Sequence, residues 1–168
     1  EHAAAMGIDP QRIAAGGGSA GGHLAAGTAT VTAFVEEGED ASVSCLPDAL
    51  VMFNPVFDNG PGGYGHERVK EHWRKFSPLH NIADGIPPSV TFLGTADHLV
   101  PVAAAEKWKQ KVEAVGGRAD VHLYEGAGHG FFNVSRDGGR YFRDTVEKTD
   151  RFFASLGWLE GDATVGED

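Results

Sequence analysis

The chain has 168 residues, the length of one domain, and its 41% hydrophobic and 23% charged residues are ordinary for a globular fold. This composition argues against a disordered chain. A membrane-spanning class is disfavoured because no apolar run approaches the roughly 18 residues that cross a bilayer. Its 14 basic and 24 acidic residues leave a formal charge of −10, which disfavours nucleic acid and anionic membrane surfaces as partners.

Cys45 is the only cysteine, so an intramolecular disulfide is excluded and no cysteine-based zinc site is expected. The first residues, EHAAAMGIDP, lack the basic start and apolar stretch of a secretory signal peptide and have the pattern of a helix interior. Because the sequence opens without methionine, we expect the natural start of the protein to lie upstream. The compartment stays open.

Glycines and prolines divide the sequence into short apolar runs and longer amphipathic runs, as strands and helices do in α/β proteins. In chain order the predicted elements are a strand at 12–16, a helix at 20–34, a strand at 49–53, an irregular excursion at 54–88 with a helix at 66–75, a strand at 89–93, a helix at 101–115, a strand at 119–124 and a helix at 139–156. The last helix is expected to pack across the sheet with Phe142, Val146, Thr149, Phe153 and Leu156.

Strands joined through helices imply parallel crossovers, so the predicted fold class is α/β, a mostly parallel sheet flanked by helices. Reactive groups in such sheets gather at the carboxyl ends of the strands. Ser19 follows the first predicted strand, Asp97 the third and His129 the fourth. The sequence therefore predicts a Ser-His-Asp catalytic site at that edge of the sheet.

Residues 17–21 read Gly-Gly-Ser-Ala-Gly and match G-x-S-x-G, in which the small residues on either side of the serine permit a strained strand-to-helix turn. Glycine-rich turns of this kind also bind phosphate groups. The phosphate-loop pattern requires a lysine that is absent here, and the dinucleotide pattern requires an acid after the second strand, where the chain reads Phe53-Asn54-Pro55. The serine nucleophile is the favoured interpretation.

The other two site residues each have a simpler alternative. Asp97 stands between a strand and a helix, and the alternative role for an aspartate at such a place is that of a helix cap. His129 is flanked by glycines in a loop, where histidines are usually surface residues. Their order after Ser19 favours catalytic roles. Asp58 is kept as an alternative acid because it follows the second strand, whereas His23 is expected to pack or hydrogen-bond.

Several remaining residues carry weaker signals. Residues 59–75 either border an acyl or sugar pocket or form a surface excursion, and His98 is expected to be a loop residue. His66, His72 and His80 have no recognisable zinc spacing, so neither a metal nor a cofactor is predicted.

The segments GGGSAGGHLA, FLGTADHLVP and YEGAGHGFF resemble the nucleophile elbow, acid turn and histidine loop of α/β-hydrolase carboxylesterases. The resemblance covers residues 9–158 and is closest to the branch that holds carbohydrate acetyl esterases, feruloyl esterases and hormone-sensitive-lipase-like enzymes. FNPVFDNGP resembles a segment of the esterases that act in polysaccharide breakdown. The resemblance implies a serine carboxylesterase of short-chain acyl esters, with acetyl esters of carbohydrates as expected substrates. The N–H of Ala20 is expected to be one oxyanion donor.

The chain departs from this family in its length. Members carry a second oxyanion donor and four further strands ahead of the nucleophile strand. Residues 1–158 are therefore expected to be the C-terminal catalytic half of the usual domain, truncated before the nucleophile strand, and residues 159–168 a flexible tail. The strand before Ser19 would be an exposed edge, so we expect a homo-oligomer or a covering chain there. A prolyl-oligopeptidase-like peptidase and a catalytically impaired fragment are the alternatives.

Overall fold

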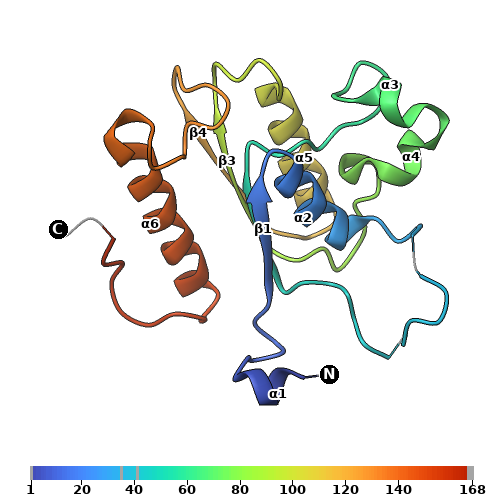
Figure 1. Ribbon diagram of the computed structural model, residues 1–168, viewed down its shortest axis with the longest axis horizontal. Coiled ribbons are helices and arrows are strands. Elements are labelled where there is room, and N and C mark those ends of the chain that lie inside the picture. Colours follow the sequence, from blue (N-terminus) through green and yellow to red (C-terminus); the bar gives the residue numbers. More distant parts are fainter. Residues whose placement is uncertain (1, 35, 41, 166–168) are drawn as a thin grey trace.

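A parallel sheet forms the centre of the computed structural model, which describes residues 2–34, 36–40 and 42–165. Its strands are β1 (Ala14–Gly18), β2 (Ala49–Phe53), β3 (Ser89–Gly94) and β4 (Ala119–Tyr124), in the spatial order β1-β2-β3-β4. Every neighbouring pair is parallel. All carboxyl ends therefore lie along one edge, as the predicted fold class requires (Figure 1).

Helices cover both faces of this sheet (Figure 1). The longer ones are α2 (Ala20–Thr30), α5 (Val102–Ala114) and α6 (Arg140–Ser155). The short ones are α1 (Ala3–Met6), α3 (His66–Val69), η1 (Lys70–His72), α4 (Trp73–Phe76), η2 (Pro78–His80) and η3 (Asp137–Gly139). No helix of the described chain is long and apolar enough to cross a membrane.

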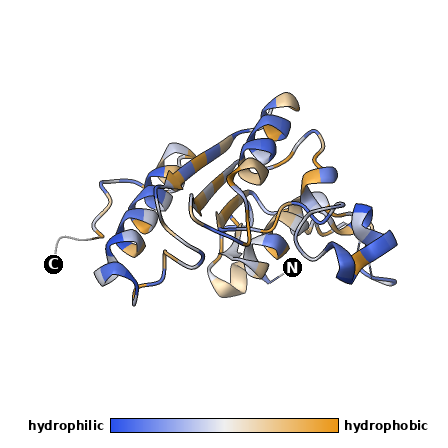
Figure 2. Cartoon of the chain, turned by 90° about the horizontal axis from the view of Figure 1, so that it is seen from above, coloured by the Kyte–Doolittle hydropathy of each residue, from blue (hydrophilic) through white to orange (hydrophobic). Residues whose placement is uncertain are grey.

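Side chains alternate between two apolar clusters because successive strand residues point to opposite faces. On the face of α2 and α5, Leu50 and Met52 pack with Trp108, whose ring lies 4.3 Å from that of Phe57. On the other face, Val51 and its neighbours pack against α6. Figure 2 shows the hydrophobic residues concentrated along the strands. This double cover fixes the sheet that carries the site residues.

The strand predictions at 49–53 and 119–124 are confirmed to the residue, and the strand at 89–93 extends by Gly94. The first strand is displaced from 12–16 to Ala14–Gly18. Its glycines are in register with β2, from Gly16 beside Val51 to Gly18 beside Phe53. A Cβ on Gly16 would lie 2.8 Å from the Val51 carbonyl oxygen, so the glycine permits this close pairing.

The helix predictions are right in place but wrong at several ends. The helix at 20–34 stops at Thr30, because Val31 is extended. The helix at 66–75 is three short segments, since Lys70 has φ of 41° and interrupts the helical backbone. Pro101 caps α5 instead of lying in its first turn. Of the face predicted for α6, Phe153 and Leu156 pack against the core. Phe142 is instead 39% exposed, and the buried residues of the helix are Thr145 and Phe152.

β1 lies at an edge of the described sheet and pairs only with β2. The exposed edge expected from the sequence is therefore present. Of the predicted tail at 159–168, residues 166–168 lie outside the described residues, and residues 159–165 form no helix or strand.

Candidate active site

Ser19 occupies the turn between β1 and α2. Its backbone has φ of 55° and ψ of −113°, a conformation that costs a non-glycine residue about 1–3 kcal/mol. Two backbone hydrogen bonds hold it: the Ser19 N–H donates to the Phe53 carbonyl at 2.9 Å, and its own carbonyl accepts from the His23 N–H at 3.0 Å. This turn stands at the carboxyl edge of the sheet.

The glycines around Ser19 have unequal steric roles. A Cβ on Gly17 would lie 2.7 Å from the carbonyl carbon of Gly21, and a Cβ on Gly22 would lie 2.8 Å from Pro55. A Cβ on Gly21 would meet nothing within 4 Å. The residue whose side chain this turn excludes is therefore Gly17, and Gly21 has room for a Cβ. The backbone of Gly21 lies close to Gly17, and the lack of a Cβ on Gly17 makes this close approach possible.

We expect Gly17→Ala to destabilise the protein by about 1–3 kcal/mol, because backbone atoms on both sides would have to shift. Gly21→Ala should instead stabilise it by about 0.5–1 kcal/mol, because alanine replaces glycine within a helix. Urea unfolding of the two variants measures both effects. Equal destabilisation by both substitutions would contradict this account of the turn.

Asp97 and His129 complete a hydrogen-bonded chain with Ser19. The Nε2 atom of His129 lies 3.0 Å from the Ser19 Oγ, and its Nδ1 atom lies 2.8 Å from Oδ2 of Asp97. The Asp97 side chain is fully buried, and that of His129 is 21% exposed. The structure thus brings together the three residues that the sequence singled out.

The Asp97 carboxylate is anchored from its other side. Its Oδ1 atom accepts the backbone N–H groups of Leu99 at 2.9 Å and Val100 at 3.1 Å. These bonds compensate the burial of a charged group and leave Oδ2 for the imidazole. An ionised carboxylate only accepts hydrogen bonds, so Nδ1 carries the ring proton and Nε2 is free to accept one from Ser19.

The loop that carries His129 is packed onto the serine turn through aromatic rings. Phe132 lies 4.8 Å from the ring of Phe53, which ends β2. A Cβ on Gly18 would lie 2.6 Å from the tip of Phe132, so this ring sits directly against the last residue of β1. Sequence reasoning did not find this contact, which brings the histidine loop to the turn.

Sequence reasoning also missed Asn54. This residue follows β2 directly, is 1% exposed and has φ of 35°. Its Nδ2 atom lies 3.4 Å from Nε2 of His129, and its Oδ1 atom accepts the N–H of Gly130 at 3.2 Å. Its place at the carboxyl end of a strand was the available signal, because polar groups there face the site.

Ala20 begins α2 immediately after Ser19. The first N–H groups of a helix have no partner within it, and the helix dipole favours negative charge beside them. The Ala20 N–H therefore suits an oxyanion donor.

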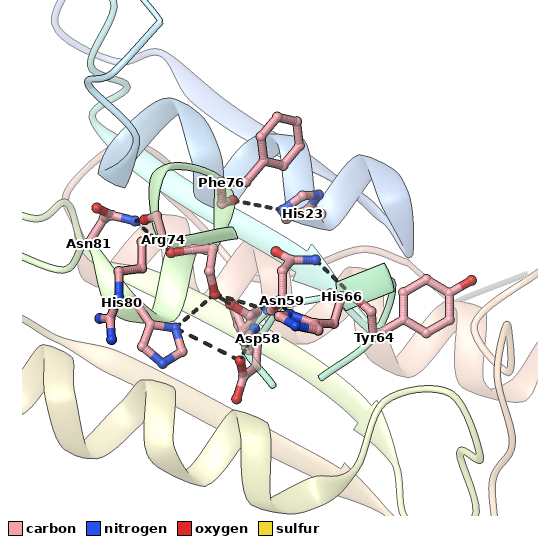
Figure 3. A network of polar contacts seen from close by, with 12 residues as sticks. His23, Asp58, Asn59, Tyr64, His66, Arg74, Phe76, His80 and Asn81 are labelled. Carbon is pink, nitrogen blue, oxygen red and sulfur yellow. Dashed lines mark hydrogen bonds and ion pairs between the residues drawn. The ribbon is translucent and has the colours of Figure 1, made fainter. Parts of the chain in front are cut away.

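Asp58 belongs to a separate polar network that does not include His129 (Figure 3). Its Oδ1 atom lies 3.8 Å from Nδ1 of His80, which is also 2.8 Å from the Ser77 Oγ. Burial lowers the pKa of His80 from its ordinary value, although the Asp58 charge acts in the opposite direction. The imidazole of His129 hydrogen-bonds to Asp97, whereas the histidine that Asp58 contacts is His80.

The remaining histidines are engaged elsewhere or exposed. His23 hydrogen-bonds to the Phe76 carbonyl at 3.2 Å, the bonding role expected for it (Figure 3). His66 bonds to the Asn59 carbonyl at 2.9 Å, and His98 is exposed in its loop. Within the described residues, no three His, Cys, Asp or Glu side chains are grouped to hold a metal ion.

The model of the dienelactone hydrolase family matches residues 3–159. The chain belongs to the dienelactone hydrolase family. Its parallel sheet and flanking helices are those of the α/β-hydrolase fold that this family shares.

The chain is also similar to solved structures of one esterase. Thermogutta terrifontis esterase 2 phosphorylated by paraoxon is 38% identical with a TM-score of 0.88, and covers 96% of this chain. The apo form of that esterase is 39% identical with a TM-score of 0.89. Other structures of it have propionate or butyrate bound. This chain spans 60% of the paraoxon-treated chain and 62% of the apo chain.

Curated relatives are more distant and longer. A probable isoprenylcysteine alpha-carbonyl methylesterase, ICMEL1 of Arabidopsis thaliana, is 31% identical, and the match covers 76% of this chain and 32% of the relative. The esterase LipC of Mycobacterium tuberculosis is 30% identical, and the match covers 75% of this chain and 36% of the relative. This dienelactone hydrolase family member thus spans about a third of their length.

Proposed function

We propose that this chain carries the active site of a serine carboxylesterase, with Ser19 as nucleophile, His129 as general base and Asp97 as the group that orients the imidazole. One observation carries the proposal: Ser19 Oγ lies 3.0 Å from the Nε2 of a His129 ring whose Nδ1 is 2.8 Å from the buried Asp97 carboxylate. This is the arrangement that activates a serine hydroxyl. The names of the relatives support ester hydrolysis.

The reaction would run in two halves. The Ser19 Oγ attacks the ester carbonyl carbon while its proton passes to Nε2 of His129, and a tetrahedral oxyanion forms beside the Ala20 N–H. The bond to the alcohol oxygen then breaks, and the alcohol leaves with the proton from Nε2. Water next attacks the acyl-enzyme, gives a proton to His129, and releases the carboxylic acid as Ser19 recovers its hydrogen.

We extend the proposal to short acyl groups, with acetyl esters of carbohydrates as the substrate class. Propionate and butyrate bound to Thermogutta terrifontis esterase 2 support a short acyl chain. The segment FNPVFDNGP, which resembles that of polysaccharide-degrading esterases, supports a carbohydrate alcohol. The net charge of −10 also favours neutral over anionic esters.

The proposal also includes a polypeptide segment that covers the edge of β1 and supplies the second oxyanion donor. The open edge of β1 leaves backbone groups unpaired, and the apolar Ile13, directly before the strand, is 47% exposed, so this edge is of the kind that pairs with further polypeptide. A segment of the same protein or a second copy that covers this edge would bring a backbone N–H toward Ser19. We propose such a covering segment or chain as the partner.

Labelling by paraoxon tests the assignment of the nucleophile. We expect paraoxon to transfer its diethyl phosphoryl group to Ser19 and release p-nitrophenolate, and peptide mass spectrometry locates the adduct. Ser19→Ala should remain unlabelled, while Ser42→Ala, which changes an exposed serine bonded to Asp40, should label like the wild type. An adduct on another residue, or none, would refute the proposal.

Turnover distinguishes the alternatives. Hydrolysis of p-nitrophenyl acetate by a protein that is also labelled at Ser19 supports the esterase. Labelling without turnover favours the impaired fragment, and preference for acyl-peptides over acetyl esters favours the peptidase.

A further inference from the structure

Asn54 is held in an unusual place for a polar side chain. It is 1% exposed, and its φ of 35° lies in the left-handed region that asparagine tolerates better than most residues. Its own N–H donates to the Phe92 carbonyl at 2.8 Å, which fixes its backbone at the end of β2. The side chain therefore enters the site from a rigid element.

The orientation of its amide follows from one neighbour. The backbone N–H of Gly130 lies 3.2 Å from Oδ1 of Asn54, and a backbone N–H can only donate. Oδ1 is therefore the acceptor on that side, and Nδ2 is directed at Nε2 of His129, 3.4 Å away. One side chain thus contacts both the imidazole and the residue that follows it.

Two donors then face a single acceptor. Because Nδ1 of His129 donates to Asp97, the lone pair of Nε2 faces both the Ser19 hydroxyl at 3.0 Å and the Asn54 amide at 3.4 Å. Once Nε2 has taken the serine proton, the amide offers that proton no acceptor. The acceptors that the described contacts place beside that proton are the oxygens at Ser19, which in the reaction include the departing alcohol.

We propose that Asn54 is a positioning residue for the reaction, which directs Nε2 of His129 toward Ser19 and keeps a competing acceptor away from it. This inference rests on the esterase function proposed above. It goes beyond the Ser19, His129 and Asp97 arrangement because it assigns a fourth side chain, from β2, to the control of the imidazole. A purely structural role would end at the bond to Gly130.

Two substitutions separate these roles. Asn54→Asp keeps the size, the tolerance of positive φ and the acceptor for Gly130, but places a carboxylate oxygen beside Nε2. Asn54→Gly keeps the backbone freedom and removes both contacts. The readout is kcat and KM for p-nitrophenyl acetate across pH, after circular dichroism has shown that each variant is folded.

Asn54→Asp should move the acid limb of the kcat/KM profile to higher pH by about one unit or more, because the carboxylate stabilises a protonated ring. Asn54→Gly should lower kcat by about 10- to 100-fold with KM changed less than about 3-fold, because the ring is less well directed. Other charged groups near the loop, namely Glu125, Arg136 and Asp137, are the same in every variant.

Asn133→Asp is the matched control, because it makes the same chemical change at an exposed position of the same loop, and it removes the bond that Asn133 Nδ2 donates to the Gly130 carbonyl at 2.7 Å without placing a charge beside Nε2. Its acid limb should stay within about 0.5 unit of the wild type, since exposed charges are screened. A folded Asn54→Asp variant whose kcat/KM profile has the acid limb of the wild type, or an Asn54→Gly variant with the kcat of the wild type, overturns this inference. Neither result contradicts the proposed esterase function. If the Asn54→Asp variant does not fold, the kcat of Asn54→Gly decides whether the inference holds. An inactive, unlabelled wild type overturns the esterase proposal and this inference with it.

Discussion

Ser19→Ala is expected to lower kcat for p-nitrophenyl acetate by about three to six orders of magnitude. Alanine removes the oxygen that forms the acyl-enzyme and leaves His129 without a proton to accept. The residual rate would come from the oxyanion donor and from substrate binding alone. KM should change little, because the hydroxyl acts mainly in the transition state.

The fold of this variant should be retained, because alanine keeps the Cβ and the backbone bonds of Ser19 to Phe53 and His23 involve no side-chain atom. Thermal unfolding monitored by circular dichroism checks this. Ser42→Ala serves as the control and should keep wild-type kcat. A Ser19→Ala protein that keeps more than about a tenth of the wild-type rate would show that another group is the nucleophile.

The proximity of Ser19, Asp97 and His129 could be predicted from the sequence because it depends on the topology of the sheet more than on the details of side-chain packing. Each residue lies just past the carboxyl end of a strand, and parallel strands bring those ends to one edge. The strands themselves were visible as continuous apolar runs such as Ala49–Phe53, which is buried from both faces by helices. Local pattern and global fold agree at these positions.

The features that were missed depend on contacts between segments far apart in the sequence. Gly16 and its neighbours have weak strand propensity, yet they form β1 because β2 pairs with their backbone. Lys70 interrupts a helical pattern without the glycine or proline that would mark a break. Phe142 has the right spacing for an inner face, but α6 turns Thr145 and Phe152 inward instead. Tertiary packing decided each of these.

Asn54 illustrates the limit within the site. The sequence places a polar residue at the end of the second strand, but the dinucleotide pattern specifies an acid there and assigns no role to an asparagine. Its importance emerges from the 3.2 Å and 3.4 Å contacts to Gly130 and His129, residues 76 and 75 positions away. No local pattern encodes a contact across such a separation.

Asp97→Asn is expected to lower kcat by about 10⁴-fold while leaving the fold intact. The asparagine Oδ1 can still accept the N–H groups of Leu99 and Val100, so the acid turn should persist. Its Nδ2 then faces Nδ1 of His129, where the carboxylate Oδ2 accepts a proton in the wild type. Two donors cannot share this bond, so the ring should move its proton to Nε2 and lose the acceptor for Ser19.

Asp58→Asn is the matched control, because it makes the same chemical change in the carboxylate that the sequence left as the alternative acid. Asp58 contacts His80 rather than His129, so kcat for p-nitrophenyl acetate should fall by less than about 3-fold. If Asp58→Asn reduced kcat as strongly as Asp97→Asn, the acid would be assigned to the wrong loop. Because both residues follow strands at the same edge, the pair tests whether contact with the imidazole, and not position on the sheet, makes an aspartate part of the site.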